Sequence, residues 1–237
     1  MKKILIGKSG IAGLLAAAAV ILAVVPASGQ EIVESERKGF GFFIGVHMTR
    51  FSLSGDFDGI TLIIPGETEA FITPSMKSKN VVGFSLGVGT GRGGRDRFFV
   101  ELRHFETTPE ALYQGEKADV KSSVWSLGVR YMYTEWFIQP YIRAGFSYGR
   151  LRVVEGAISS DGTFGDAVFT GGGLAVGLGA AIWLPPCFSI FAEGGFDSMD
   201  YRNVKGPAGD NWNLMSISGT GLGGGGLTFA VGLQLMY

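Results

Sequence analysis

Six charged residues are the part of this sequence most able to do chemistry, because each interrupts an otherwise apolar or glycine-rich stretch. They are three carboxylates and three guanidinium groups, namely Glu101, Arg103, Arg130, Arg143, Glu193 and Asp197. A charge is costly to hold away from water unless an opposite charge lies beside it. We therefore expect these side chains to pair with one another wherever the fold turns them toward a common interior.

The sequence gives little support for catalysis or for metal binding. It contains two histidines, His47 and His104, and a hydroxyl nucleophile needs such a base within hydrogen-bond reach. Glu106 follows His104 at a spacing of two, but no motif fixes a serine and an acid beside either histidine. Cys187 is the only cysteine, which excludes a thiolate metal cluster. We predict no enzymatic activity, no metal and no cofactor, and the formal net charge of −1 gives no indication of nucleic-acid binding.

The start of the chain is typical of an export signal. A basic segment, Met1–Lys8, precedes an apolar run over Ile11–Val25, and small residues follow it. A retained membrane helix would need about 18 apolar residues, more than this run supplies. The pattern predicts a signal peptide over residues 1–29, cleaved before Gln30, and one mature domain that begins there.

Large apolar residues alternate with small or polar ones through most of the remaining chain. In one such stretch, Leu127 and Val129 share one parity, whereas Gly128 and Arg130 share the other. A period of two is typical of a strand with two different faces. We predict eight strands, over residues 40–53, 80–90, 97–107, 120–133, 136–152, 167–184, 187–199 and 226–237. The six charges fall on the faces that also carry glycine.

The connections between these strands alternate between long and short. The short ones lie near residues 91–96, 134–135 and 185–186. No apolar run after the export signal is long enough for a transmembrane helix, and only helices and closed barrels satisfy every backbone group in lipid. Short periplasmic turns and longer outer loops are typical of outer-membrane barrels.

The last predicted strand carries a resemblance to a known family. Its large apolar side chains share one face, at Phe229, Val231, Leu233, Leu235 and Tyr237. A C-terminal strand that ends on an aromatic residue resembles the membrane-insertion signal of outer-membrane β-barrels, which usually ends in Phe. With the alternation and the loop lengths, residues 40–237 resemble the small eight-stranded barrels of the OmpA/OmpX type.

This resemblance implies an all-β fold, an eight-stranded antiparallel transmembrane up-and-down β-barrel in the outer membrane of a Gram-negative bacterium. It also implies contact with outer-membrane lipid and lipopolysaccharide, and folding by the barrel-assembly machinery. A soluble barrel of the lipocalin kind is the alternative, but its outward face would be polar. Here the face opposite the glycines is uniformly apolar.

Inside such a barrel, the six charges would form either a structural ion-pair core or a gate of exchangeable salt bridges that blocks a narrow water path. We expect a structural or surface-interaction role through the extracellular loops. A narrow channel for small or hydrophobic solutes is the main alternative, and a lipid-modifying enzyme is a third.

Basic residues collect at the predicted outer ends of the strands. They are candidates for contact with lipopolysaccharide phosphates, for which Arg and Lys are well suited. The candidates are Arg50, Lys77, Lys79, Lys121, Arg150 and Arg152. Ordinary solvated loop charge is the alternative.

A long connection near the start of the mature chain, Ile60–Thr73, has the pattern of a hairpin around Pro65-Gly66. Its apolar residues are Ile60, Leu62, Ile64, Phe71 and Ile72. They form either an exposed patch for an extracellular ligand, or an extension of the first two strands that is buried against neighbouring loops. If the hairpin entered the membrane, the barrel would have ten strands.

Overall fold

The structure is a computed structural model. It describes residues 40–51, 54–57, 59–63, 70–77, 79–90, 96–133, 137–159, 162–184, 187–207, 211–214 and 222–236. The predicted signal peptide and the terminal Tyr237 lie outside these ranges. No helix within them is long and apolar enough to cross a membrane.

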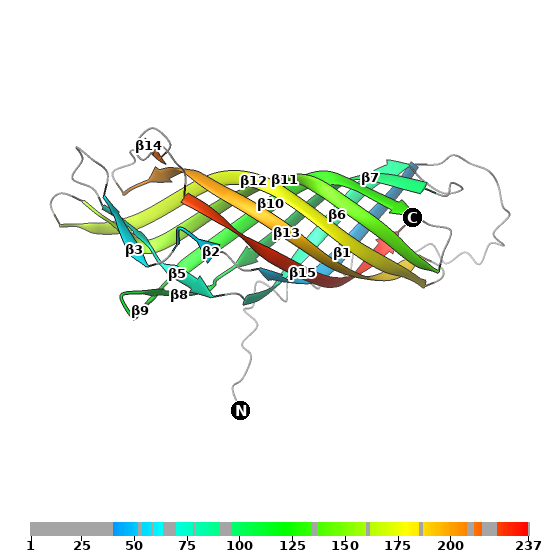
Figure 1. The fold of residues 1–237 in the computed structure, drawn as a ribbon, viewed down its shortest axis with the longest axis horizontal. Helices are drawn as coiled ribbons and strands as arrows, with labels where there is room; N and C mark the ends of the chain where they lie inside the picture. Colours follow the sequence, from blue (N-terminus) through cyan, green and yellow to red (C-terminus); the bar gives the residue numbers. More distant parts are fainter. Residues whose placement is uncertain are drawn as a thin grey trace, which may run out of the picture. The chain divides into compact units, whose positions relative to one another are not determined.

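Eight long strands form a closed barrel (Figure 1). They are β1 (Phe40–Phe51), β6 (Lys79–Thr90), β7 (Asp96–Thr107), β10 (Val120–Tyr133), β11 (Ile138–Ile158), β12 (Phe164–Leu184), β13 (Phe188–Lys205) and β15 (Leu222–Met236). Each pairs antiparallel with the next long strand along the chain, and β15 pairs with β1 to close the barrel. The predicted eight-stranded, antiparallel, up-and-down barrel is confirmed.

The outward face of the barrel is a band of exposed apolar side chains. Leu178, for example, is 68% exposed, whereas Arg130 on an inward face is 0% exposed. The residues expected on the lipid face are all exposed: Leu127, Val129, Leu174, Val176, Leu178 and Leu233. A soluble barrel would expose polar side chains at these positions, so this band is the surface that meets the hydrocarbon of a bilayer.

The strands do not all end at the same height. β11, β12 and β13 have 21, 21 and 18 residues, whereas β1, β6 and β7 have 12 each. Short strands gather at the end of the barrel opposite the short turns (Figure 1): β2 (Ser54–Gly55), β3 (Ile60–Ile63), β4 (Ala70–Thr73), β5 (Ser75–Lys77), β8 (Glu110–Tyr113), β9 (Glu116–Ala118) and β14 (Asn211–Asn213). Since short turns face the periplasm in such barrels, we infer that this end is extracellular. We call these short strands and the outer ends of β11, β12 and β13 the cap.

The predicted hairpin exists, but its attachment differs from the expectation. β3 pairs with β4, and β4 pairs with β11 through Ala157↔Phe71, rather than extending the first two strands. The reason is that the pairing of β10 with β11 ends at Val120↔Val153, which leaves the last residues of β11 without a neighbour on that side. β4 occupies this vacant edge, and the hairpin lies in the cap rather than adding strands to the membrane barrel.

Candidate functional site

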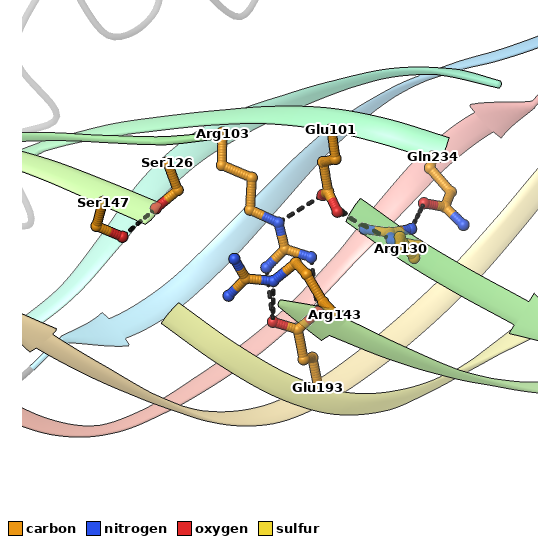
Figure 2. A network of polar contacts seen from close by, with 8 residues as sticks. All are labelled: Glu101, Arg103, Ser126, Arg130, Arg143, Ser147, Glu193 and Gln234. Atoms are coloured by element: carbon orange, nitrogen blue, oxygen red, sulfur yellow. Dashed lines mark hydrogen bonds and ion pairs between the residues drawn. The ribbon is translucent and has the colours of Figure 1, made fainter. Parts of the chain in front are cut away.

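Five of the six predicted lumen charges lie together inside the barrel (Figure 2). Arg103 is their centre. Its Nε donates to Glu101 Oε1 at 2.5 Å, and its two terminal nitrogens donate to the two carboxylate oxygens of Glu193 at 2.7 and 2.6 Å. This two-pronged contact is the strongest geometry that a guanidinium and a carboxylate can adopt. Because β7 and β13 are not neighbours in the barrel, it spans the lumen.

A second arginine lies at each end of this central link. Arg130 on β10 donates to both oxygens of Glu101, at 3.0 and 2.7 Å, and to Gln234 Oε1 at 2.9 Å. Arg143 on β11 donates to Glu193 at 3.2 Å. The result is one chain of alternating sign, Arg130–Glu101–Arg103–Glu193–Arg143 (Figure 2). We call it the ion-pair chain.

The strand register explains why this alternation is required. Arg130 and Arg143 are directly opposed on β10 and β11, an arrangement that is destabilising for like charges. Each guanidinium turns instead toward a different carboxylate. Gly177 provides space on β12, where a Cβ would come within 2.9 Å of Glu193 Oε1. The inward glycines therefore make room for long charged side chains.

Asp197, the sixth predicted charge, lies outside the ion-pair chain. Its side chain is buried and lines a small polar cavity with His47, Thr228 and Arg143. The cavity measures about 20 Å³, which is room for about one water molecule. Asp197 adds a third carboxyl group to an interior whose ion-pair chain holds three arginines and two glutamates.

On the periplasmic side, a layer of aromatic side chains lies beneath Arg130. The Arg130 guanidinium carbon lies 4.5 Å from the ring centres of both Phe43 and Tyr141, and 5.8 Å from that of Phe191. Cations are attracted to such ring faces. Phe99 packs edge-on against Phe43, and all four rings are buried. We call this layer the aromatic floor.

On the extracellular side, the barrel is closed by the apolar core of the cap. Phe57 makes edge-on contacts with Phe169 and Tyr201, and Phe71 packs against Phe169. The remaining buried members include Leu151 and further apolar residues from the ends of the long strands. This core lies above the polar cavity, so the inward faces change from charged to apolar along the barrel.

Some apolar residues of the hairpin are buried and others are exposed. Phe71 is 0% exposed and Ile72 is also buried, so for these two residues the structure agrees with the buried alternative rather than with the exposed patch. Phe71 on β4 is part of the cap core, and Leu62, which is directly opposed to it on β3, packs against that core. Ile63, by contrast, is 68% exposed. The side chains of Ile60 and Ile64 lie outside the described part of the chain.

The two histidines lie on opposite faces and share no site. His47 points inward, and His104 points outward. His104 stacks on Trp125 at 3.9 Å between ring centres, its Nδ1 donates to the carbonyl of Val124 at 3.1 Å, and Nε2 lies 3.5 Å from Glu106. Within the described ranges, no three His, Cys, Asp or Glu residues are grouped as a metal site would require.

The basic candidates at the outer rim are exposed but occur in separate places. Lys121 on β10 lies directly opposite Arg152 on β11, and Arg150 lies two residues before Arg152 on the same strand. Arg50 lies on β1 and Lys77 on β5, apart from this group. Lys79 on β6 donates to the carbonyl of Thr108 at 2.8 Å.

The described residues of the proposed insertion signal lie on β15, and Tyr237 lies outside the described ranges. Phe229, Val231 and Leu233 are exposed on the lipid face, as their parity indicates. Leu235 shares that parity but is buried between its opposed neighbours Ile44 and Phe188.

Sequence reasoning missed the closure of both ends of the lumen. The aromatic floor combines residues from β1, β7, β11 and β13, and the cap core combines segments that lie far apart in the chain. One signal was present. On β11 the inward residues change from Arg143 and Ser147 to Leu151 and Val153, which marks the point where the interior becomes apolar.

No protein-family model matches this sequence, and no curated protein is similar to it. Solved structures share its fold. The outer membrane protein OprG from Pseudomonas aeruginosa is 15% identical, with 86% of this chain and 98% of that chain covered and a TM-score of 0.50. This chain has the fold of an outer-membrane β-barrel.

Two further structures show the same kind of likeness. Ail, the attachment invasion locus protein of Yersinia pestis, is 14% identical, with coverage of 84% and 99% and a TM-score of 0.48. Neisserial surface protein A is 16% identical, with coverage of 83% and 98% and a TM-score of 0.46. The apolar band on this barrel agrees with a location in the outer membrane of a Gram-negative envelope.

Proposed function

We propose that this protein is a closed, non-conducting outer-membrane barrel that acts through its extracellular cap and has no enzymatic activity. The observation that supports this proposal is the filling of the lumen by three successive layers. The aromatic floor, the ion-pair chain and the cap core all consist of buried side chains. A cavity with room for about one water molecule is too small for a solute to pass.

The ion-pair chain supports a structural role more strongly than a gate. A gate opens when one salt bridge is exchanged for another at little cost. Here Arg103 contacts Glu101 and Glu193 together, so moving it would leave two buried carboxylates with fewer partners. Breaking one buried pair costs roughly 3–5 kcal/mol. The aromatic floor would also have to move before a path reached the periplasm.

The cap offers a surface for contact outside the cell. Ile63, Ala70, Ile158 and Phe164 are opposed in one row across β3, β4, β11 and β12. The two ends of this row, Ile63 and Phe164, are 68% and 59% exposed. We assign the proposed extracellular ligand contact of the Ile60–Thr73 hairpin to this row, since exposed apolar patches commonly mark interaction sites.

At the membrane surface, the exposed cations would hold lipopolysaccharide. We retain Arg50, Lys77, Lys79, Lys121, Arg150 and Arg152 as the candidates for its phosphates. In the same proposal, the outward residues of β15 and the terminal Tyr237 serve the barrel-assembly machinery.

Conductance separates the closed barrel from a channel. The purified mature protein should produce no stepwise currents in a planar bilayer, and neither should a variant that lacks residues 60–69. The deletion removes β3 and residues 64–69 but retains Phe71, a residue of the cap core. Discrete current steps from the intact protein would contradict the proposal, and would favour the solute channel.

The surface role needs a separate readout. Cells that carry the deletion of residues 60–69, or the pair Ile63→Ser and Phe164→Ser, should lose any surface-binding phenotype that the intact protein confers. A matched control, Ile72→Val, keeps the exposed row intact because Ile72 is buried. Unchanged binding by the Ser variants would show that the row is not the contact surface.

A further inference from the structure

Three basic residues gather on the outward face of β10 and β11, and the strand register fixes their arrangement. Lys121 lies directly opposite Arg152, and Ser123 lies directly opposite Arg150. Directly opposed residues on an antiparallel pair have Cβ atoms about 4.5–5.5 Å apart, and diagonal neighbours are within reach of long side chains. Lys121, Arg150 and Arg152 therefore share one patch, with the Ser123 hydroxyl among them.

The charges in this patch are only partly balanced. Arg152 donates through Nε to Asp166 on β12 at 2.6 Å. Lys121 and Arg150 are exposed, and neither forms an ion pair with another residue of the described ranges. The exposed Arg202 on β13 differs, because its Nε lies 2.7 Å from Asp200. Glu106 on β7 lies directly opposite Ser123 on its other side, but it is 3.5 Å from His104 Nε2 and, among the described residues, forms no ion pair with either cation. The two neighbouring cations are therefore arranged to receive an anion from outside the protein.

The height of the patch identifies where that anion would come from. Directly below it, Trp125 and Tyr148 are opposed on the same outward face, followed by the pairs Leu127↔Phe146 and Val129↔Ala144. Tyr and Trp are enriched where hydrocarbon meets the polar headgroups. The cations thus lie at headgroup level on the extracellular side of the membrane. His104 stacks on Trp125 and fixes the indole ring there.

We propose that Lys121, Ser123 and Arg150 bind a phosphate of lipopolysaccharide, with the acyl chains of the same molecule lying over Leu127 and Phe146. The inference rests on the general lipid contact in the proposed function and narrows it to one site and one chemical group. A guanidinium presents a planar set of donors that fits phosphate oxygens, a lysine adds a second positive charge, and the serine supplies a neutral donor.

The test uses the full mature protein in detergent micelles, titrated with purified bisphosphorylated lipid A. The double variant Lys121→Gln/Arg150→Gln should bind it at least about tenfold more weakly, because two charge-assisted contacts are lost. The charge-preserving variant Lys121→Arg/Arg150→Lys should remain within about threefold of the intact protein. The matched control Arg202→Gln removes an exposed cation on another strand and should change binding by less than about twofold.

Two further ligands identify the source of the phosphate. Dephosphorylated lipid A should bind the intact protein about as weakly as bisphosphorylated lipid A binds the double Gln variant. In the first case the ligand lacks the phosphates, and in the second the protein lacks the two cations. Phosphatidylglycerol should bind more weakly than bisphosphorylated lipid A. Equal affinity for the two phosphorylated lipids would overturn the assignment to lipopolysaccharide, and unchanged binding by the double Gln variant would overturn the site.

The circular dichroism and heat-dependent gel mobility of each variant establish that the barrel has formed before binding is compared. The outcome is also independent of the closed-lumen proposal. The substitutions Lys121→Gln and Arg150→Gln change no residue of the lumen, so the double Gln variant should also produce no current. Conversely, a conducting intact protein with an intact lipid A site would contradict the proposed closure and leave this inference standing.

Discussion

In the first half of strand β11, polar side chains point into the barrel and apolar side chains point outward. In its second half, apolar side chains point inward and polar side chains point outward. Its inward residues change from Arg143 and Ser147 to Leu151 and Val153. Its outward residues change from Ile142, Ala144 and Phe146 to Arg150 and Arg152 in the same interval. β13 makes the same change, from inward Glu193 and Asp197 to inward Met199 and Tyr201.

One continuous sheet therefore uses two sources of stability. In the cap the outer surface meets water, so burying apolar side chains inside gains the hydrophobic effect. Within the membrane the outer surface meets lipid, so apolar side chains on the outer face are already removed from water. The interior there is held by charges, and it is stable only if each charge has a partner. Substitutions in the two regions should therefore have different signatures.

The largest effect should come from the centre of the ion-pair chain. Arg103→Ala removes contacts to Glu101 and Glu193 together, and should lower the free energy of unfolding by about 3–5 kcal/mol. Urea unfolding of the protein in lipid vesicles measures it. In a double-mutant cycle with Glu193→Ala, the double variant should lose less than the sum of the single losses. Strict additivity would show that the two side chains are not coupled.

In the cap, a comparable loss should come from an apolar substitution. Phe71→Ala removes a fully buried ring, and should cost about 3 kcal/mol of local stability. Hydrogen exchange should speed up in β4 and at the outer end of β11, while amides beside the ion-pair chain stay protected. The control Ile63→Ala, on the exposed row, should change exchange little. Equal acceleration throughout the barrel would show that the two regions do not open separately.

A smaller effect should come from the end of the ion-pair chain. Among the described residues, Arg143 donates to one carboxylate, Glu193, at 3.2 Å, so Arg143→Ala should cost about 1.5–3 kcal/mol, less than Arg103→Ala. The same unfolding measurement ranks the two variants. A loss larger than that of Arg103→Ala would contradict this ranking. It would mean that the repulsion between Arg143 and the opposed Arg130 is relieved by something other than the contact of Arg143 with Glu193.

The smallest effect should come from the ion pair at the outer surface. Arg152 pairs with Asp166 where both are in contact with water, so Arg152→Ala should cost less than about 1 kcal/mol. This loss should shrink further when the unfolding experiment is repeated in high salt, because salt screens exposed charges. The loss caused by Arg103→Ala should persist under the same conditions. A salt-sensitive Arg103 effect would contradict the burial of the ion-pair chain.

Much of the barrel could be predicted from sequence because each strand carries its own evidence. Alternation depends only on residues two apart, and β10 shows it in Leu127 and Val129 against Gly128 and Arg130. The inward charges followed from the same parity. The pairing of these charges could not be predicted from parity, since the contact of Arg103 with Glu193 across the lumen depends on the geometry of the barrel.

The cap could not be predicted because its contacts are non-local. Phe71 pairs with Ala157, and nothing in either segment specifies the other as its neighbour. The hairpin itself was predictable from its turn residues and short apolar strands, but the vacant edge of β11 that receives it exists only once β10 has ended. The sequence therefore left both an exposed patch and a buried extension open for the hairpin, whereas the structure places Phe71 in the cap core and also buries Ile72.

We propose that the polar interior of the membrane barrel is closed to solvent at both ends. Ser126 lies in the polar cavity, and its hydroxyl is 2.5 Å from that of Ser147. With Cys187 replaced by serine, a cysteine at Ser126 should react with a small charged thiol reagent at least about a hundredfold more slowly than a cysteine at the exposed Glu116. Comparable reaction rates at the two positions, with the barrel folded in lipid, would show that solvent reaches the lumen and that the account of its closure is wrong.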